Sequence, residues 1–215
     1  MPDETPTRER ILDAAEVLFA QRGFEGVSVR QIMRKADADV SLAYYHFKSK
    51  RDLFDQVMLR RAEYVNRIRF EALEEVEARH ADDRPTVDEI IGAFTQPLLQ
   101  LLADDHDEWS HYFQLVAQIN NSPEMGGELM SRYFDPLVSR FIEALRRALP
   151  DCDDRELYWS YYFMSGALTL TLAETGRIDN LSGGLCKATD TSEINERMHV
   201  FLAAGFRTLC SPRGG

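Results

Sequence analysis

The most informative part of this sequence is a basic segment near the N-terminus of an otherwise acidic chain. The 215 residues carry a net charge of −11. Residues 22–51, however, hold seven basic side chains against three acidic ones, a net charge of +4, which leaves −15 for the remainder. Lys and Arg bind phosphate by releasing its counterions, so we expect only this segment to meet a polyanion. The basic residues are Arg22, Arg30, Arg34, Lys35, Lys48, Lys50 and Arg51.

Aromatic side chains lie among these basic groups. Tyr44 and Tyr45 can each donate a hydroxyl to phosphate or stack against a sugar or a thymine methyl group, and His46 can donate one ring N–H. The alternative is that these rings pack in a small core, which is what we expect of Phe47.

The basic side chains fall near predicted helix starts. Lys48 and Lys50 lie at the beginning of one helix, where ammonium groups and backbone amides can hold the same anion. Arg30, near the start of the preceding helix, can hold a neighbouring phosphate. The alternative is that these charged side chains form an ordinary solvent-exposed surface with no binding role.

Residues that could support catalysis or bind metal form no recognisable arrangement. His106 and His111 are five residues apart, whereas two ligands on one helical face need a spacing of four. No GxSxG, GxxxxGK[ST], GxGxxG or HExxH motif occurs. Cys152, Cys186 and Cys210 are odd in number and far apart, so we expect neither a disulfide scaffold nor a zinc site. The sequence predicts no enzyme, no catalytic residue, no metal and no cofactor.

The elements that position these groups are predicted to be helices throughout. Apolar residues recur at helical spacing and no segment alternates with a period of two, which predicts an all-α fold. Caps are expected at Ser28, Asp39, Ser49 and Thr86. Approximate helices are 7–22, 28–35, 39–45, 49 to beyond 68, 86–102 with a bend at Pro97, 107–120, 122–150 opened by Ser122-Pro123-Glu124, 153–174 and 192–209, with a loop over 177–191.

No apolar run reaches the roughly 18–20 residues needed to cross a bilayer, and the N-terminus is acidic. We therefore expect a soluble cytoplasmic protein with no membrane association.

The first three predicted helices match a helix-turn-helix reader of DNA. A longer helix precedes two short ones that are joined by a tight turn, and the second short helix, Asp39–Tyr45, would enter the major groove. On pattern alone, a helical scaffold module whose N-terminal helices bind a protein partner is an equal alternative.

Several runs within residues 7–54 resemble the TetR family. They are Thr7–Phe19, Arg22-Gly23-Phe24, Ser28–Ile32, Tyr44-Tyr-His-Phe-Lys-Ser-Lys50 and Leu53-Phe54. The resemblance implies a dimeric repressor with a helix-turn-helix domain over residues 1–52 and a ligand-binding and dimerisation domain over 53–215. It places Ser41, Leu42 and Tyr45 near bases, and Arg30, Tyr44, His46 and Lys50 near phosphates of a double-stranded operator.

The turn between the two short helices departs from the family pattern. Ala36-Asp37-Ala38-Asp39 stands where the family usually has Ala-Gly-Val-Ser. Asp tolerates a left-handed backbone better than most residues, so we expect the turn to survive, with Asp39 capping the next helix and Asp37 pointing away.

The C-terminal region resembles, more weakly, family members that sense fatty acids or acyl-CoA, through Leu157–Trp159, Tyr162–Ala167 and Phe201–Arg207. Its small residues in the middle of helices predict close helix contacts, either between subunits of a homodimer or within the chain. These residues are Ser165, Gly166, Ala167, Ala203, Ala204 and Gly205.

Aromatic residues at helical spacing on three successive helices predict the walls of a cavity for a small hydrophobic ligand, although core packing is the default for most of them. They are Trp109, Tyr112, Phe113, Phe134, Phe141, Trp159, Tyr162 and Phe163.

Overall fold

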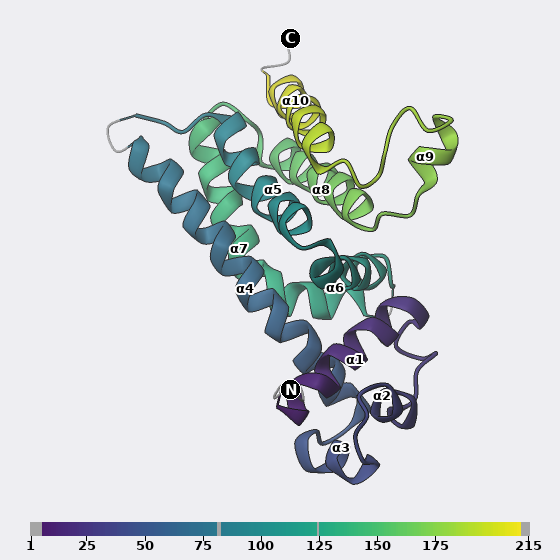
Figure 1. Ribbon diagram of the computed structural model, residues 1–215. Coiled ribbons are helices and arrows are strands. Elements are labelled where there is room, and N and C mark those ends of the chain that lie inside the picture. Colours follow the sequence, from purple (N-terminus) through teal and green to yellow (C-terminus); the bar gives the residue numbers. More distant parts are fainter. Residues whose placement is uncertain (1–5, 81–82, 124, 212–215) are drawn as a thin grey trace.

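The computed structural model describes residues 6–80, 83–123 and 125–211 (Figure 1). These residues contain helices and no strand, which confirms the all-α prediction. The helices are α1 (Thr7–Arg22), α2 (Val29–Lys35), α3 (Val40–His46), α4 (Lys50–Arg79), α5 (Val87–Asp104), α6 (His106–Asn120), α7 (Gly126–Ala148), α8 (Asp154–Leu172), α9 (Arg177–Leu181) and α10 (Thr191–Leu209).

Side-chain caps define where several helices begin. Ser28 accepts a hydrogen bond from the Gln31 amide, and the Gln31 side chain accepts one from the Ser28 amide, so two amide donors are satisfied at the start of α2. Thr86 and Glu89 repeat this reciprocal pair at α5, and Ser49 caps α4. The predicted caps are confirmed.

Two boundaries differ from the prediction. Helix α7 begins at Gly126 rather than near Ser122, and a Cβ at Gly126 would lie 2.8 Å from the Ile119 carbonyl oxygen. Glu124, expected in its first turn, lies outside the described residues. The predicted loop 177–191 contains the short helix α9.

Helix α4 joins the two ends of the molecule. Figure 1 shows α1–α3 gathered at one end and α8 and α10 packed together at the other, while α4 extends from the first group along α5 and α7. Buried apolar residues from both ends form one continuous core. The predicted domain boundary at residues 52/53 falls in the first turn of α4.

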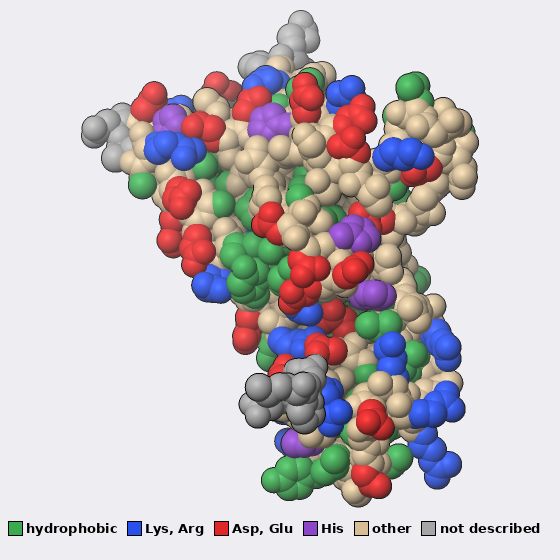
Figure 2. All heavy atoms as spheres, viewed as in Figure 1, with side chains coloured by type: hydrophobic (Ala, Val, Ile, Leu, Met, Phe, Trp, Pro, Cys, Tyr) green, Lys and Arg blue, Asp and Glu red, His purple; other side chains and the backbone are tan. Residues whose placement is uncertain are grey.

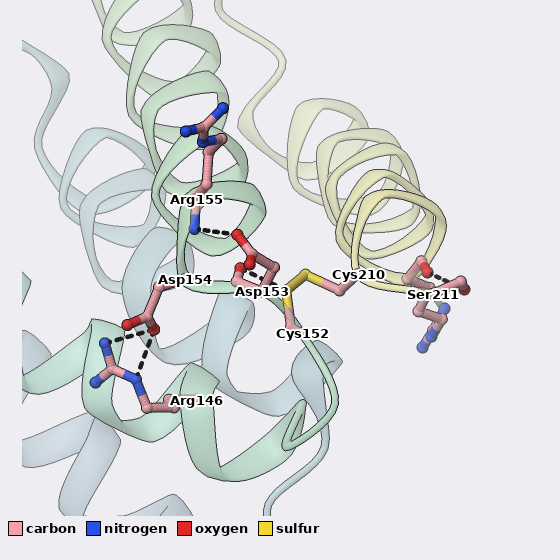
Figure 3. The surroundings of a disulfide bond; sticks show 8 residues. Arg146, Cys152, Asp153, Asp154, Arg155, Cys210 and Ser211 are labelled. Carbon is pink, nitrogen blue, oxygen red and sulfur yellow. Dashed lines mark hydrogen bonds and ion pairs between the residues drawn. A yellow bond between two sulfur atoms is a disulfide. The ribbon is translucent and has the colours of Figure 1, made fainter. Parts of the chain in front are cut away.

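A disulfide joins the two ends of the α8–α10 segment, contrary to the expectation from cysteine spacing. Cys152 precedes α8 and Cys210 follows α10, and their Cα atoms lie 4.5 Å apart (Figure 3). The prediction failed because a separation of 58 residues says nothing about which helix ends meet. Cys186 is free.

Candidate nucleic-acid interface and ligand cavity

Helix α3 has one buried face and one exposed face. Ala43 is buried, and Leu42 is partly buried against the core. Phe47, which follows the helix, is buried as predicted. Residues at positions i, i+1, i+4 and i+5 form the opposite face, where Tyr44 is 71% and Tyr45 80% exposed. Two large rings displayed on a seven-residue helix are available to a partner. The exposed face consists of Val40, Ser41, Tyr44 and Tyr45.

Asp39 fixes the start of this helix. Its Oδ1 accepts hydrogen bonds from the Ser41 amide at 2.8 Å and from the Ser41 hydroxyl at 2.6 Å. These bonds favour the carboxylate and hold the pKa of Asp39 below its ordinary value. The Asp39 cap is confirmed, and the Ser41 hydroxyl, predicted to lie near bases, is engaged by Asp39 in this unbound structure.

Basic groups surround α3. Arg30 and Lys48 are exposed, while the Lys50 ammonium lies over the Phe24 ring, 4.2 Å from its centroid. His46 is half-buried beside the Tyr45 ring. Figure 2 shows Lys and Arg side chains along one edge of the lower part of the molecule, whereas acidic side chains are numerous over the upper part and have basic ones among them. The charge asymmetry of the sequence is thus a spatial one.

The turn between α2 and α3 keeps a glycine-type geometry without a glycine. Asp37 has φ +48°, and the amides of Asp37 and Ala38 donate to the carbonyls of Arg34 and Met33. This pair of bonds is the Schellman motif, in which the left-handed position is usually Gly. The turn therefore survives the departure from the family pattern.

We expect Asp37→Gly to raise the free energy of unfolding by about 0.5–1 kcal/mol, because Gly adopts a positive φ without a Cβ penalty. Urea denaturation would measure this, with Asp37→Asn as the control that removes the charge but keeps a side chain. A glycine variant less stable than the native chain would contradict this account of the turn.

The structure contains a cavity between α4, α5, α6, α7 and α8. Of the aromatic residues predicted to line one, Tyr112, Phe113 and Phe134 do so. The lining is otherwise largely apolar and includes Val65, Leu98, Val116, Met130, Val138, Leu168 and Leu172.

The other predicted cavity residues lie elsewhere. Phe141 is fully buried against Phe94, and Trp109 stacks on Tyr64 under the Arg61 guanidinium, where α4 meets α6. Trp159, Tyr162 and Phe163 are more than half exposed on α8. Helical spacing places rings on a common face but does not tell which neighbour that face meets, and the structure does not bring these five rings to this cavity.

Sequence reasoning missed the polar groups of the cavity. Arg69 on α4, Tyr161 and Ser165 on α8, and Thr169 also line it. Arg69 had a visible signal, because it falls between Val65 and Leu73 at steps of four in the buried stripe of α4. A charged residue in such a stripe needs an explanation.

The small residues of α8 and α10 divide into two sets. Ser165 lines the cavity, Ala167 packs partly against the core and Ala203 is buried. By contrast, Gly166, Ala204 and Gly205 are exposed, and a Cβ at either glycine would meet no atom within 4 Å. The second set is open to a partner.

Among the described residues, no helix is both long and apolar enough to cross a membrane. Within the same ranges, no three His, Cys, Asp or Glu side chains come together as a metal site.

Comparisons with known proteins agree with this geometry. The family described as "Bacterial regulatory proteins, tetR family" matches residues 11–57, and the family "Tetracyclin repressor-like, C-terminal domain" matches residues 92–205. Over 52 residues the chain is 40% identical to the HTH-type transcriptional regulator YttP of Bacillus subtilis strain 168. This match covers 24% of the chain and 25% of YttP.

Over 117 residues the chain is 24% identical to IcaR, the negative transcriptional regulator of the biofilm operon icaADBC in Staphylococcus aureus strain Newman. That match covers 54% of this chain and 55% of IcaR. The chain thus spans about a quarter of the length of YttP and about half of the length of IcaR.

Solved structures share the whole fold. A TetR-family transcription regulator from Shewanella sp. PV-4 has a TM-score of 0.67 at 13% identity, covering 93% of this chain and 97% of that one. FadR from Bacillus halodurans, a fatty acid degradation regulator, has a TM-score of 0.58 at 16% identity, covering 94% and 96%.

Proposed function

This chain belongs to the TetR family of DNA-binding transcriptional regulators, and from that premise we propose that it is a homodimeric repressor released from a palindromic operator by a small ligand. Such proteins are regulators and not enzymes. We expect it to act in the cytoplasm, where its DNA target lies.

The observation that carries the proposal is the exposed face of α3. Tyr44 and Tyr45 project from a helix whose opposite face is held by the core, with exposed Arg30 and Lys48 nearby. A short helix presented in this way fits the major groove, and flanking basic groups fit the phosphates. Exposed residues of this face have no large bidentate groups, which favours contacts with thymine methyl groups.

A dimer would place two copies of α3 on successive half-sites. The exposed side of α8 and α10 supports this arrangement, because large exposed apolar side chains lie on the same two helices as the open glycines. An apolar surface of this kind is unusual on a monomer and fits a second copy of the chain. The exposed apolar residues are Tyr158, Trp159, Tyr162, Phe163, Leu170, Val200 and Phe201.

The contact between the two ends of the molecule can transmit ligand binding. Glu16 on α1 is buried and accepts hydrogen bonds from Arg60 and Arg61 of α4, and Arg61 also pairs with Glu108 of α6. The Gln118 side chain of α6 donates to the Ala20 carbonyl of α1. A ligand that favours a different placement of α4 or α6 would therefore move α1–α3 and lower operator affinity.

Replacing Lys48 tests the DNA-binding surface. We expect Lys48→Ala to weaken operator binding by about 1 kcal/mol or more and to reduce the slope of log K against log salt by about one unit, because one phosphate contact is lost. Fluorescence anisotropy with operator DNA at several salt concentrations measures both. Lys48 is a cleaner choice than Lys50, whose ammonium also packs on Phe24.

The matched control is Lys187→Ala, an exposed lysine on the α9–α10 segment. Equal effects of the two substitutions would contradict this interface. Operator binding that did not depend on salt would favour the alternative of a protein-binding scaffold module.

The ligand proposed here is small and apolar or amphipathic, of the fatty acid or acyl-CoA kind that the sequence resemblance implies. The cavity supports this through its apolar lining and its contact with α4, the helix that reaches α1–α3.

A further inference from the structure

The cavity is lined by a cation, Arg69, that has no counter-ion among the described residues. Arg69 is 4% exposed, and no carboxylate of the described residues lies within ion-pair distance of it. Its Nε donates to the Phe94 carbonyl at 3.0 Å, and its guanidinium lies over the Phe94 ring, 3.7 Å from the centroid. One carbonyl and one ring face hold the side chain without neutralising its charge.

A buried charge without a counter-ion lowers the free energy of unfolding. Charged groups are almost never fully buried unless they are paired, because removing a charge from water costs several kcal/mol. Burial lowers the pKa of Arg69 to about 10, so the guanidinium is still protonated at neutral pH. Arg60 and Arg61, which are half-buried at the junction of α1 and α4, are each paired with Glu16. Arg69 is more deeply buried than either and has no such carboxylate partner among the described residues.

Tyr112 supplies a second polar group to the lining of the cavity. The Tyr112 hydroxyl is buried and has no hydrogen-bond partner among the described residues, and burial raises the pKa of Tyr112 so that it remains a neutral donor. Buried hydroxyls are normally bonded, so this one is available to donate to a water or to a ligand. Tyr161 lines the same cavity, and burial raises its pKa, so it is neutral as well.

The remainder of the cavity selects for an apolar body. Its walls are mostly aliphatic and aromatic, and the volume open to the centre of a water molecule is about 60 Å³. One buried water occupies roughly 10–15 Å³ on this measure, so the space holds a few waters or a compact organic group.

We propose that the cavity binds an organic acid with an apolar body, whose carboxylate is held by the Arg69 guanidinium and the Tyr112 hydroxyl. This rests on the proposed function and narrows its ligand class. It favours a free acid over its coenzyme A thioester, because a thioester carbonyl carries no charge for Arg69 to neutralise. A guanidinium matches a carboxylate with parallel N–H donors.

The test compares acids with neutral amides of the same shape. Benzoate and phenylacetate, each beside its primary amide, would be titrated into the full-length protein by isothermal titration calorimetry. We expect at least one acid to bind ten times or more tightly than its amide, because hydrogen bonds to a charged group contribute more than neutral ones. Arg69→Met should remove this preference, and Arg69→Lys should retain part of it.

The outcomes distinguish a failure of the ligand cavity itself from a failure of the carboxylate-binding role of Arg69. Equal binding of acids and amides to the native protein would overturn the role of Arg69 and leave an apolar ligand cavity standing. A preference that persisted in Arg69→Met would overturn it as well. Failure of every acid and amide to bind would overturn both the cavity of the proposed function and this inference.

Arg69→Met also has a readout that does not require a ligand. Since the charge has no partner, we expect this variant to melt at the same temperature as the native protein or higher. A large loss of stability would show instead that Arg69 holds α4 against α5, and would overturn the inference.

Discussion

Gly205→Glu is expected to convert the proposed dimer into a folded monomer that no longer binds the proposed operator with measurable affinity. A Cβ at Gly205 meets nothing within 4 Å in the protomer, and replacing Gly within a helix removes a penalty of about 1 kcal/mol, so the protomer should fold at least as well. In the proposed dimer, however, the new carboxylate would be buried among the exposed rings of α8 and α10, where an unpaired charge costs several kcal/mol. Analytical ultracentrifugation and operator titration measure the two consequences.

Gly127→Glu is the matched control. Gly127 is also exposed with no atom near its Cβ position, but it lies in the first turn of α7, away from α8 and α10, where an acidic residue suits the helix dipole. The control should remain a dimer. If Gly205→Glu remained a dimer as well, the interface would have to lie on another face.

Reduction of the Cys152–Cys210 disulfide is expected to lower the free energy of unfolding by about 4 kcal/mol, from the chain entropy released when a closed loop of this length is opened. The bond closes a segment with a separation of 58 residues that includes α8, α9 and α10. Guanidinium denaturation with and without dithiothreitol measures the change. Because the bond joins the start of α8 to the end of α10, reduction should also weaken the proposed dimer.

Cysteine substitutions separate the bond from the thiols. Cys210→Ser should reproduce the effect of the reductant, whereas Cys186→Ser should have none, since Cys186 is free. A loss below about 1 kcal/mol would mean that the reduced chain keeps its loop closed by packing alone, contrary to the entropic estimate.

Local signals made the helical fold predictable. The reciprocal caps at Ser28 and Thr86 and the single cap at Asp39 depend on residues within three positions of each other, so they can be read from the sequence and appear in the structure. The start of α7 was less accessible, because it depends on the approach of Gly126 to the end of α6. The disulfide depends on where two distant helix ends lie, which no local pattern encodes.

The candidate sites show the same division. The exposed face of α3 follows from a helical period and from the buried Ala43 and Phe47 beside it. The cavity does not, because Tyr112 and Trp159 are equally aromatic and equally helical in the sequence, and only packing buries one and exposes the other. Arg69 was overlooked because charge is ordinarily a sign of the surface.

Helix α4 is long enough for a small rotation at the cavity to become a larger displacement at its N-terminal end. Its 30 residues carry Lys50 in the first turn and Arg69 nineteen positions later, a separation of about 28 Å along the axis at 1.5 Å per residue. A tilt of about 5° near the cavity would displace the DNA-facing end by roughly 2.5 Å on that arm. Hydrogen bonds to bases and phosphates tolerate only a few tenths of an ångström, so in the proposed dimer a very small shift of Arg69 by a ligand would be enough for both copies of α3 to lose their register on DNA.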